Sequence, residues 1–292
     1  MKKTKTKIAA SFVVLIAIFA FFSLACAETL KVGFVTDWES GSQKKYDHKL
    51  PKKAGSYLKS AVRHYNKVFL PDLVVGGGDY ILNRHVSSKK AVKQIKAINK
   101  SFKKANAPKL YCIGNHDLSD LSKTQVQQAL GIDYSHSATD LNGIRIITLD
   151  TNSLNSGESK YGVTGRVSDE EMEWLEEKLN TVFPVIVFTH HSPISTPEDN
   201  DWRTNIYDAA ELRSTLEKNG NVVAVFSGHT ALNYSTERNG INYVIINNLT
   251  DEKAKNSFAD ITVEKTASSV SVSASQLGKK PASYSFSKAL SD

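Results

Sequence analysis

The sequence is poor in cysteine, with only Cys26 and Cys112 among its 292 residues. We expect Cys26 to leave with an N-terminal signal, so the remaining chain cannot form an intramolecular disulfide. Cys112 lies in the apolar stretch LYCIG, which is typical of a small buried hydrophobic residue. A disulfide-stabilised scaffold is therefore excluded.

The sequence also lacks a strong charge imbalance and an internal repeat. It has 37 basic and 30 acidic residues, a formal net charge of +7. Four of the lysines lie within residues 1–27, so residues 28–292 carry only +3 by the same counting. This charge gives little support to nucleic acid as a partner, and none is expected. No sequence period of 20 to 50 residues is visible, which argues against a repeat architecture.

A long apolar run occurs at the N-terminus, in MKKTKTKIAASFVVLIAIFAFFSLACA. A basic start, an apolar middle from Ile8 to Ala25 and small residues before Glu28 are typical of a secretory signal peptide. We predict a signal peptide over residues 1–27 and one domain over residues 28–292, secreted or periplasmic, with no stable membrane association after cleavage. An uncleaved anchor is the alternative that the length permits. A lipoprotein signal is less favoured, because Ser23 stands where such signals usually carry leucine.

Short apolar segments rich in valine and isoleucine recur through the first 230 residues, and each ends at glycine, aspartate, asparagine or histidine. This pattern is typical of buried strands that deliver polar residues to one edge of a sheet. We predict strands over 30–36, 72–77, 109–114, 143–150, 183–189 and 221–228. Helical periodicity predicts helices over 92–105, 168–179 with a Ser168 cap, and 207–218. Later alternating segments predict strands over 241–247, 258–264 and 268–274, followed by a loose tail of about a dozen residues.

Polar residues that can coordinate a metal follow five of the predicted strands. Carboxylate, amide oxygen and imidazole together are ligands for a divalent first-row metal ion. Ligand sites in such sheets lie beyond the carboxyl ends of the strands. The five groups are Asp37, Asp79, the run Asn115-His116-Asp117, the pair His190-His191, and His229. Their common placement predicts a metal site.

The order of these groups resembles the calcineurin-like metallophosphoesterase family, whose motifs run D-x-H, GD, GNHD or GNHE, a histidine near a proline, and GHxH. The matching segments are TDWES, GGGDY, GNHD, FTHHSP and SGHT. The resemblance implies a four-layer αββα sandwich, with two mixed β-sheets packed face to face and helices outside. It also implies one or two divalent metal ions, of which Mn, Fe, Zn and Mg are the candidates.

The resemblance assigns two metal positions. The second metal position takes Asp79, Asn115, His190 and His229, with His191 as a rival to His190 because HSP also fits the histidine-proline motif. The first metal position keeps Asp37 and the bridging Asp79, whereas Glu39 and Ala231 stand where the family has histidines. Both departures therefore fall on the same metal.

Three interpretations of the altered position stay open. Glu39 can serve as an oxygen ligand and favour Mn, Mg or Ca. The protein can hold one ion tightly and a second one weakly. It can also be a degenerate member that binds phosphate-containing ligands without turnover. His48, in the loop YDHKLPKK, is a further candidate ligand, although a loop histidine is more often exposed.

The resemblance implies attack by a metal-bound hydroxide on phosphorus. His116 matches the acid that protonates the leaving group, and Asp117 is predicted to orient its ring, with an ordinary turn carboxylate as the alternative. We therefore predict an exported metal-dependent phosphatase or phosphodiesterase. Its small phosphorylated substrate is a phosphomonoester, a phosphodiester or a nucleotide diphosphate derivative. The alternative is a non-catalytic extracytoplasmic protein that binds a phosphate ligand.

Overall fold

The structure is a computed structural model that describes residues 27–82, 86–153, 164–196 and 206–290. The predicted signal peptide therefore lies, except for its last residue, outside the described residues and stays a prediction. Within the described ranges, none of the helices combines the length and the apolar character needed to cross a membrane.

The first of two six-stranded sheets has the order β12-β11-β10-β1-β2-β3. Its strands β1, β2 and β3 are parallel, and β10, β11 and β12 extend it in antiparallel fashion. The strands are β1 (Glu28–Val35), β2 (Leu73–Gly76), β3 (Lys109–Tyr111), β10 (Phe258–Lys265), β11 (Ser269–Leu277) and β12 (Ala282–Ala289).

The second sheet has the order β4-β5-β6-β7-β9-β8. Its four central strands are parallel, and an antiparallel strand closes each edge. The strands are β4 (Ser137–Leu141), β5 (Ile144–Thr148), β6 (Val185–Phe188), β7 (Val222–Ser227), β8 (Tyr234–Arg238) and β9 (Ile241–Ile245).

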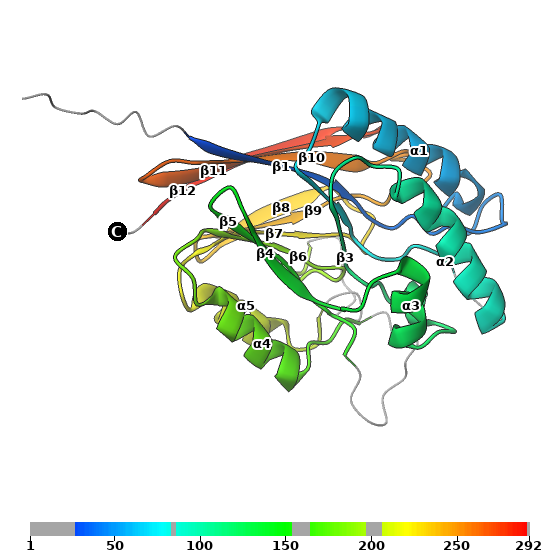
Figure 1. Cartoon of the computed structure of the whole chain (residues 1–292), viewed down its shortest axis with the longest axis horizontal. Helices are drawn as coiled ribbons and strands as arrows, with labels where there is room; N and C mark the ends of the chain where they lie inside the picture. The colour runs from blue at the N-terminus through cyan, green and yellow to red at the C-terminus, as the bar shows by residue number, and fades with distance from the viewer. Residues whose placement is uncertain (1–26, 83–85, 154–163, 197–205, 291–292) are drawn as a thin grey trace, which may run out of the picture.

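Helices pack on the outer face of the second sheet and on the β1-β2-β3 half of the first (Figure 1). The first sheet carries α1 (Ala54–His64), α2 (Ser88–Phe102) and α3 (Lys123–Leu130), whereas the second carries α4 (Asp169–Leu179) and α5 (Ala209–Glu217). The predicted cap of α4 is confirmed, because Ser168 Oγ accepts a hydrogen bond of 3.2 Å from the Glu171 amide. Short helical turns occur at Pro51–Lys53, Tyr65–Phe69 and His116–Leu118.

Three apolar clusters hold these layers together. One lies between the sheets, where Phe34, Phe188 and Phe226 pack in contact. The other two lie between each sheet and its helices. Burying one such side chain contributes about 1.5–3 kcal/mol, so these clusters dominate the stabilisation. The predicted sandwich of two mixed sheets flanked by helices is confirmed, and so is the burial of Cys112, which is a free thiol.

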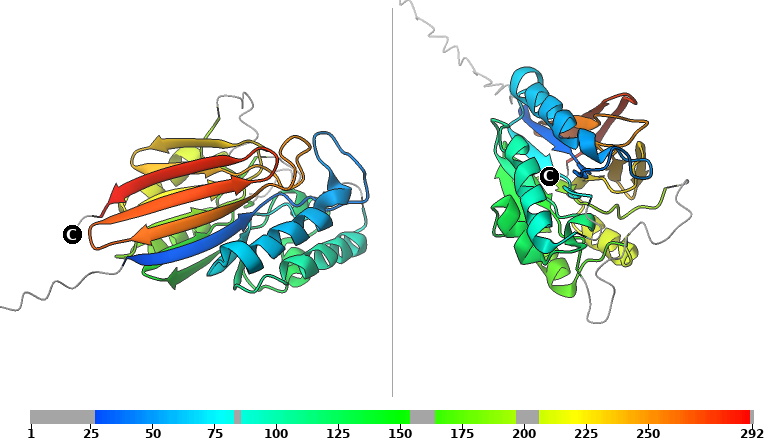
Figure 2. Two further views of the ribbon diagram at one scale, coloured as in Figure 1. Left: turned by 90° about the horizontal axis from the view of Figure 1, so that it is seen from above. Right: turned by 90° about the vertical axis from the view of Figure 1, so that its right-hand side faces the viewer.

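The structure corrects the prediction for the C-terminus. Residues 282–289 form strand β12, which pairs with β11 along its length, in place of a loose tail. Seen from above, β10, β11 and β12 lie beside α1 and α2 and are not covered by them (Figure 2). Side chains of β11 accordingly alternate between buried and exposed, with Ser273 and Ser275 facing solvent. A serine-rich strand suits this position because only one of its faces is buried.

Candidate metal centre

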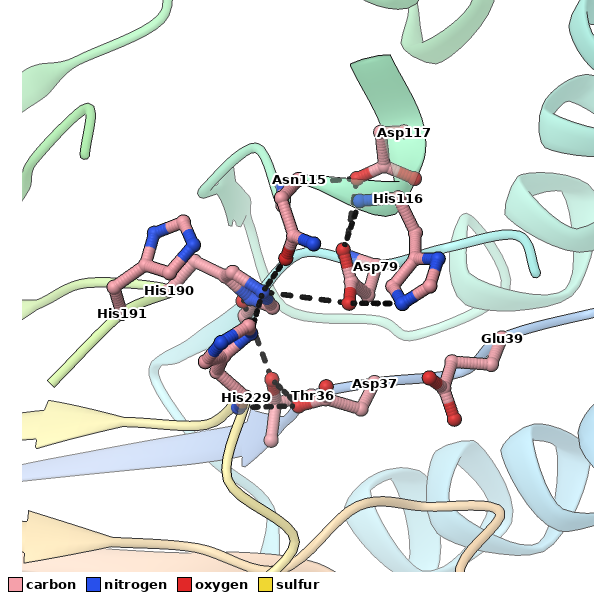
Figure 3. Close-up of polar contacts among 12 residues, drawn as sticks. Thr36, Asp37, Glu39, Asp79, Asn115, His116, Asp117, His190, His191 and His229 are labelled. Carbon is pink, nitrogen blue, oxygen red and sulfur yellow. Dashed lines mark hydrogen bonds and ion pairs between the residues drawn. The ribbon is translucent and has the colours of Figure 1, made fainter. Parts of the chain in front are cut away.

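The predicted site residues meet where the carboxyl ends of strands from both sheets come together (Figure 3). Parallel pairing places the ends of β1, β2 and β3 side by side, and the same holds for β6 and β7. Residues that follow these strands therefore lie at one edge of the sandwich. A hydrogen bond of 3.0 Å from the His229 amide to Asp37 Oδ2 joins the two sheets there.

Backbone strain is concentrated at this edge. Five of the non-glycine residues with positive φ belong to the predicted motifs, namely Asp37 (53°), Glu39 (41°), Asp79 (52°), His229 (70°) and Ala231 (55°). The left-handed conformation costs an L-residue roughly 1–2 kcal/mol. Such strain persists only where surrounding contacts enforce it, and it is a feature of functional sites.

Two glycines allow the carboxylates to approach the backbone closely. A Cβ atom on Gly114 would collide with Asp79, and one on Gly228 would collide with Asp37 and the Thr36 hydroxyl. Any larger residue at either position would displace a carboxylate. The glycines of GNHD and SGHT thus have a steric role in the site.

The four residues of the second metal position converge on one point. His190 Nε2 lies 3.1 Å from Asn115 Oδ1, 3.2 Å from His229 Nδ1 and 3.4 Å from Asp79 Oδ2. The other ring nitrogen of His190 lies 2.8 Å from the Gly77 carbonyl oxygen, to which it can only donate. In the neutral ring Nε2 is then unprotonated and directed at the other three groups.

The protonation states of the two histidines in this group differ. Burial alone would lower the pKa of His190, but the Asp79 carboxylate, which also accepts its hydrogen bond, and Asp37 raise it to about 9. In the absence of metal, a proton on His190 therefore supplies the positive charge. Burial, followed by the positive charge of His190, lowers the pKa of His229 to about 3 and keeps that ring neutral. Two imidazoles, one amide oxygen and one carboxylate fit a divalent transition-metal ion.

The rival histidine lies at the edge of the same group. His191 Nδ1 is 2.9 Å from the Thr151 hydroxyl, and its buried Nε2 has no hydrogen-bond partner among the residues that the structure describes. Ring nitrogens of His190, His191 and His229 lie within 4.8 Å of one another. His190 also contacts Asp79 and Asn115, so the geometry favours His190 as the ligand. His191 lies next to this group and contacts Thr151 instead.

The first metal position has a different composition. Asp37 Oδ2 accepts hydrogen bonds from Thr36 Oγ1 (2.6 Å) and the His229 amide, while its buried Oδ1 has no hydrogen-bond partner within the described part of the chain. The Glu39 side chain is completely buried, and its Oε2 accepts a hydrogen bond of 3.0 Å from Thr250 Oγ1. Its Oε1 is in direct ionic contact with the Lys49 ammonium, a group that sequence analysis did not identify.

The ammonium competes with a divalent ion for this position. Burial alone would lower the pKa of Lys49, but Glu39 and then Asp79 and Asp37 raise it above its ordinary value, so the side chain stays charged. At an effective dielectric constant of about 20, a divalent ion ~4 Å from the ammonium would be repelled by about 8 kcal/mol. The side chain of Ala231, at the other altered position, has no atom that can coordinate a metal ion. The residues present therefore differ from the family's metal site, which has histidines at these two positions, although Glu39, Asp79 and His116 bring possible ligand atoms within 4.8 Å of one another.

His116 stands between the two positions. Its amide donates to Asp79 Oδ1 over 2.8 Å, and its Nε2 lies 3.5 Å from Lys49 Nζ and 3.9 Å from Asp79 Oδ2. The side chain is 10% exposed, so its ring borders solvent at the site. This position suits a group that exchanges a proton with a bound ligand.

The contacts of Asp117 correct its predicted role. Its Oδ2 accepts hydrogen bonds from the amides of Asp79 (2.9 Å) and Gly114 (3.0 Å), and its Oδ1 accepts one from Tyr80 (2.8 Å). The carboxylate thus ties the loop after β2 to the loop after β3, in place of holding the His116 ring. It is a structural residue of the site because it fixes the backbone that carries Asp79.

Fold and site together define an α/β protein with a metal centre at the strand ends of a two-sheet sandwich. The model of the calcineurin-like phosphoesterase family matches residues 30–233, which include every motif described above. The chain belongs to this family.

Solved structures share the fold. A dimetal phosphatase from Danio rerio is 13% identical, with a TM-score of 0.70, covering 90% of this chain and 99% of its own. GAP50, the anchor in the inner membrane complex of Plasmodium, is also 13% identical, with a TM-score of 0.60 and 90% of each chain covered. No curated protein sequence matches the chain. At these identities the likeness concerns the fold alone.

Proposed function

We propose that the protein is an exported, metal-dependent phosphoesterase that acts on a small phosphorylated molecule. Its substrate is a phosphomonoester, a phosphodiester or a nucleotide diphosphate derivative. The observation that carries this proposal is the convergence of Asp79, Asn115 and His229 on His190 Nε2, with His116 at the border. Family membership supports the same reaction class.

Each side chain of the site has a distinct role in the proposed reaction. Asp79, Asn115, His190 and His229 would hold the divalent ion, which, when bound, supplies Lewis-acid chemistry to a phosphoryl group and lowers the pKa of water. The Gly77 carbonyl fixes the tautomer of His190, and the His116 amide orients the Asp79 carboxylate. The His116 ring is placed to give a proton to the departing oxygen. Lys49 adds a positive charge 3.5 Å from that ring.

Hydrolysis of nitrophenyl phosphate and bis(nitrophenyl) phosphate by the purified protein with Mn²⁺ tests this function. We expect turnover of at least one ester, lost on treatment with a chelator and restored by Mn²⁺. His116→Ala should retain the metal and lose ~10²- to 10⁴-fold in rate, the usual contribution of a general acid. Unchanged turnover in this variant would contradict the role of His116.

A second candidate function is ligand binding without turnover. The ammonium at the first metal position favours it, because two-metal members of the family use an ion there. Likeness in fold to GAP50, an anchor, is compatible with it. In that case inorganic phosphate would bind to the metal-loaded protein in a calorimeter, and neither ester would be hydrolysed with any of Mn²⁺, Zn²⁺, Mg²⁺ or Fe²⁺.

Export is proposed on the basis of the N-terminal sequence. Processing after Ala27 would produce a chain that begins at Glu28, the first residue of β1. N-terminal sequencing of protein recovered outside the cytoplasm should therefore read ETLKVG. A chain that retains residues 1–27 would favour the uncleaved anchor.

A further inference from the structure

The loop between β1 and α1 carries Lys49 into the first metal position. Its ammonium is in contact with Glu39 Oε1 and lies 3.5 Å from His116 Nε2. The Lys49 side chain is only 12% exposed, although residues 42–47 of the same loop are exposed. Lysine is almost never buried without a partner. The contact with the Glu39 carboxylate supplies that partner for Lys49.

The backbone holds this side chain in place. Lys49 exchanges two hydrogen bonds with Tyr46, of 2.9 and 3.0 Å, and it forms a β-bridge with Asp251. The next amide, of Leu50, donates to the Thr250 carbonyl oxygen over 2.9 Å. Thr250 also donates from its hydroxyl to Glu39. One residue therefore positions both the lysine loop and the carboxylate that the lysine contacts.

Both carboxylate oxygens of Glu39 have a partner. Oε2 accepts a hydrogen bond from Thr250, and Oε1 contacts the Lys49 ammonium. An oxygen that pairs with an ammonium has little capacity left for a metal ion. The ammonium has three N–H donors, which leaves it able to bind an anionic oxygen as well as Glu39. Glu39 thus acts as the partner of a fixed cation, and this differs from its predicted role as a metal ligand.

We propose that the Lys49 ammonium replaces the first metal ion, so that the protein binds one divalent ion per chain, at the second metal position. The inference rests on the proposed function, because it assumes that the second position holds a metal. It assigns Lys49 as a residue that faces the phosphoryl oxygens of the substrate. Glu39 and the hydroxyl of Thr250 hold Lys49 in this position.

Counting metal ions tests the proposal without reference to activity. Chelator-treated protein is titrated with Mn²⁺ in a calorimeter, and the bound metal is measured by elemental analysis after dialysis. We expect one ion per chain. Two ions would overturn the role of Lys49 and leave the proposed function intact, whereas no bound ion would overturn the proposed function itself.

Substitutions of Lys49 separate its charge from its shape. Lys49→Ala leaves the oxygens of Asp37, Glu39 and Asp79 without their cation, and hard oxygen donors favour Mn²⁺. We expect this variant to bind a second, weaker Mn²⁺, and Lys49→Arg, which retains the charge, to stay at one. Lys49→Met serves the same purpose if circular dichroism shows the alanine variant to be unfolded. A folded neutral variant that still binds only one ion would contradict the proposal.

Lys45 provides the matched control. It lies in the same loop and pairs with Glu252 on the surface, with its side chain 55% exposed. Lys45→Ala removes the same charge from the chain without altering the first metal position. We expect it to bind one ion with the affinity of the unmodified protein, so a second ion in this variant would attribute the effect to net charge and overturn the assignment to Lys49.

Discussion

His190 Nδ1 lies 2.8 Å from the Gly77 carbonyl oxygen, and this hydrogen bond connects the second sheet to the first at the site. The bond defines which nitrogen of the ring faces the other metal ligands. A carbonyl behind a ligating histidine restricts both the ring orientation and the tautomer. The His190 ring is therefore oriented toward Asp79, Asn115 and His229 in the metal-free protein.

Metal affinity should depend steeply on pH. In the metal-free protein the Asp79 and Asp37 carboxylates outweigh burial and raise the pKa of His190 to about 9, so an ion must displace a proton from Nε2. Proton and metal compete, and the Kd for Mn²⁺ should fall roughly tenfold per pH unit between about pH 6 and 8. Calorimetry in buffers of different ionisation enthalpy should detect about one proton released per ion. Binding without proton release would show that His190 is neutral or is not a ligand.

The two neighbouring histidines should differ in their effect on metal binding. His190→Ala removes the nitrogen that faces Asn115, Asp79 and His229, and we expect the Mn²⁺ affinity to fall by more than about 100-fold. His191→Ala removes a ring bonded to Thr151 and should weaken binding by less than about tenfold. Equilibrium dialysis measures both. The reverse order would make His191 the ligand.

Substitution of Asp117 should chiefly lower the stability of the fold. Asp117→Asn replaces a carboxylate that accepts three backbone hydrogen bonds by an amide whose NH₂ group would face an amide N–H. We expect the free energy of unfolding to fall by about 2–4 kcal/mol in urea denaturation. Asp133→Asn, at an exposed position, should change it by less than about 0.5 kcal/mol. Unchanged stability with a reduced rate would restore the predicted role of Asp117 in orienting His116.

Ala231 should tolerate glycine better than other alanines do. Its φ of 55° costs an alanine roughly 1–2 kcal/mol, and glycine avoids this cost while losing about 0.5–1 kcal/mol of backbone entropy. Ala231→Gly should therefore raise the free energy of unfolding by ~0.5–1 kcal/mol. Ala97→Gly, exposed within α2, should lower it by about 1 kcal/mol. A loss of stability in both variants would show that Ala231 is unstrained.

The sequence is sufficient to predict the parts of the fold with strong periodicity. Strands such as β6 and β7 are continuous apolar segments because both of their faces are buried, and α4 is marked by the Ser168 cap. The sequence analysis did not predict α1, although its buried residues Leu58, Ala61 and Val62 lie three and four positions apart, as in an amphipathic helix. It also failed for β12, because Pro281 and Gly278 before the strand suggested a tail. Pairing with β11 outweighs that local signal.

The residues of the site also differ in whether the sequence is sufficient to predict them. Residues that directly follow buried strands, such as Asp79 and His229, were found because strand ends locate them. Lys49 was not found, because its loop is held at the site by backbone hydrogen bonds with Thr250 and Glu252, about two hundred residues away in the sequence. His48, the residue considered in that loop, instead pairs with Asp47 and is partly exposed. Long-range backbone pairing decides which of two adjacent side chains enters the centre.

The ammonium beside Glu39 belongs to the polypeptide. A chelator cannot remove it from the chain, so its supply does not depend on the concentration of any solute. With the other half of the centre open to exchange, occupancy should follow simple saturation in a single ion. Where divalent metals are scarce, such a centre would need half the metal of a two-ion centre, and its remaining charge would be supplied at synthesis.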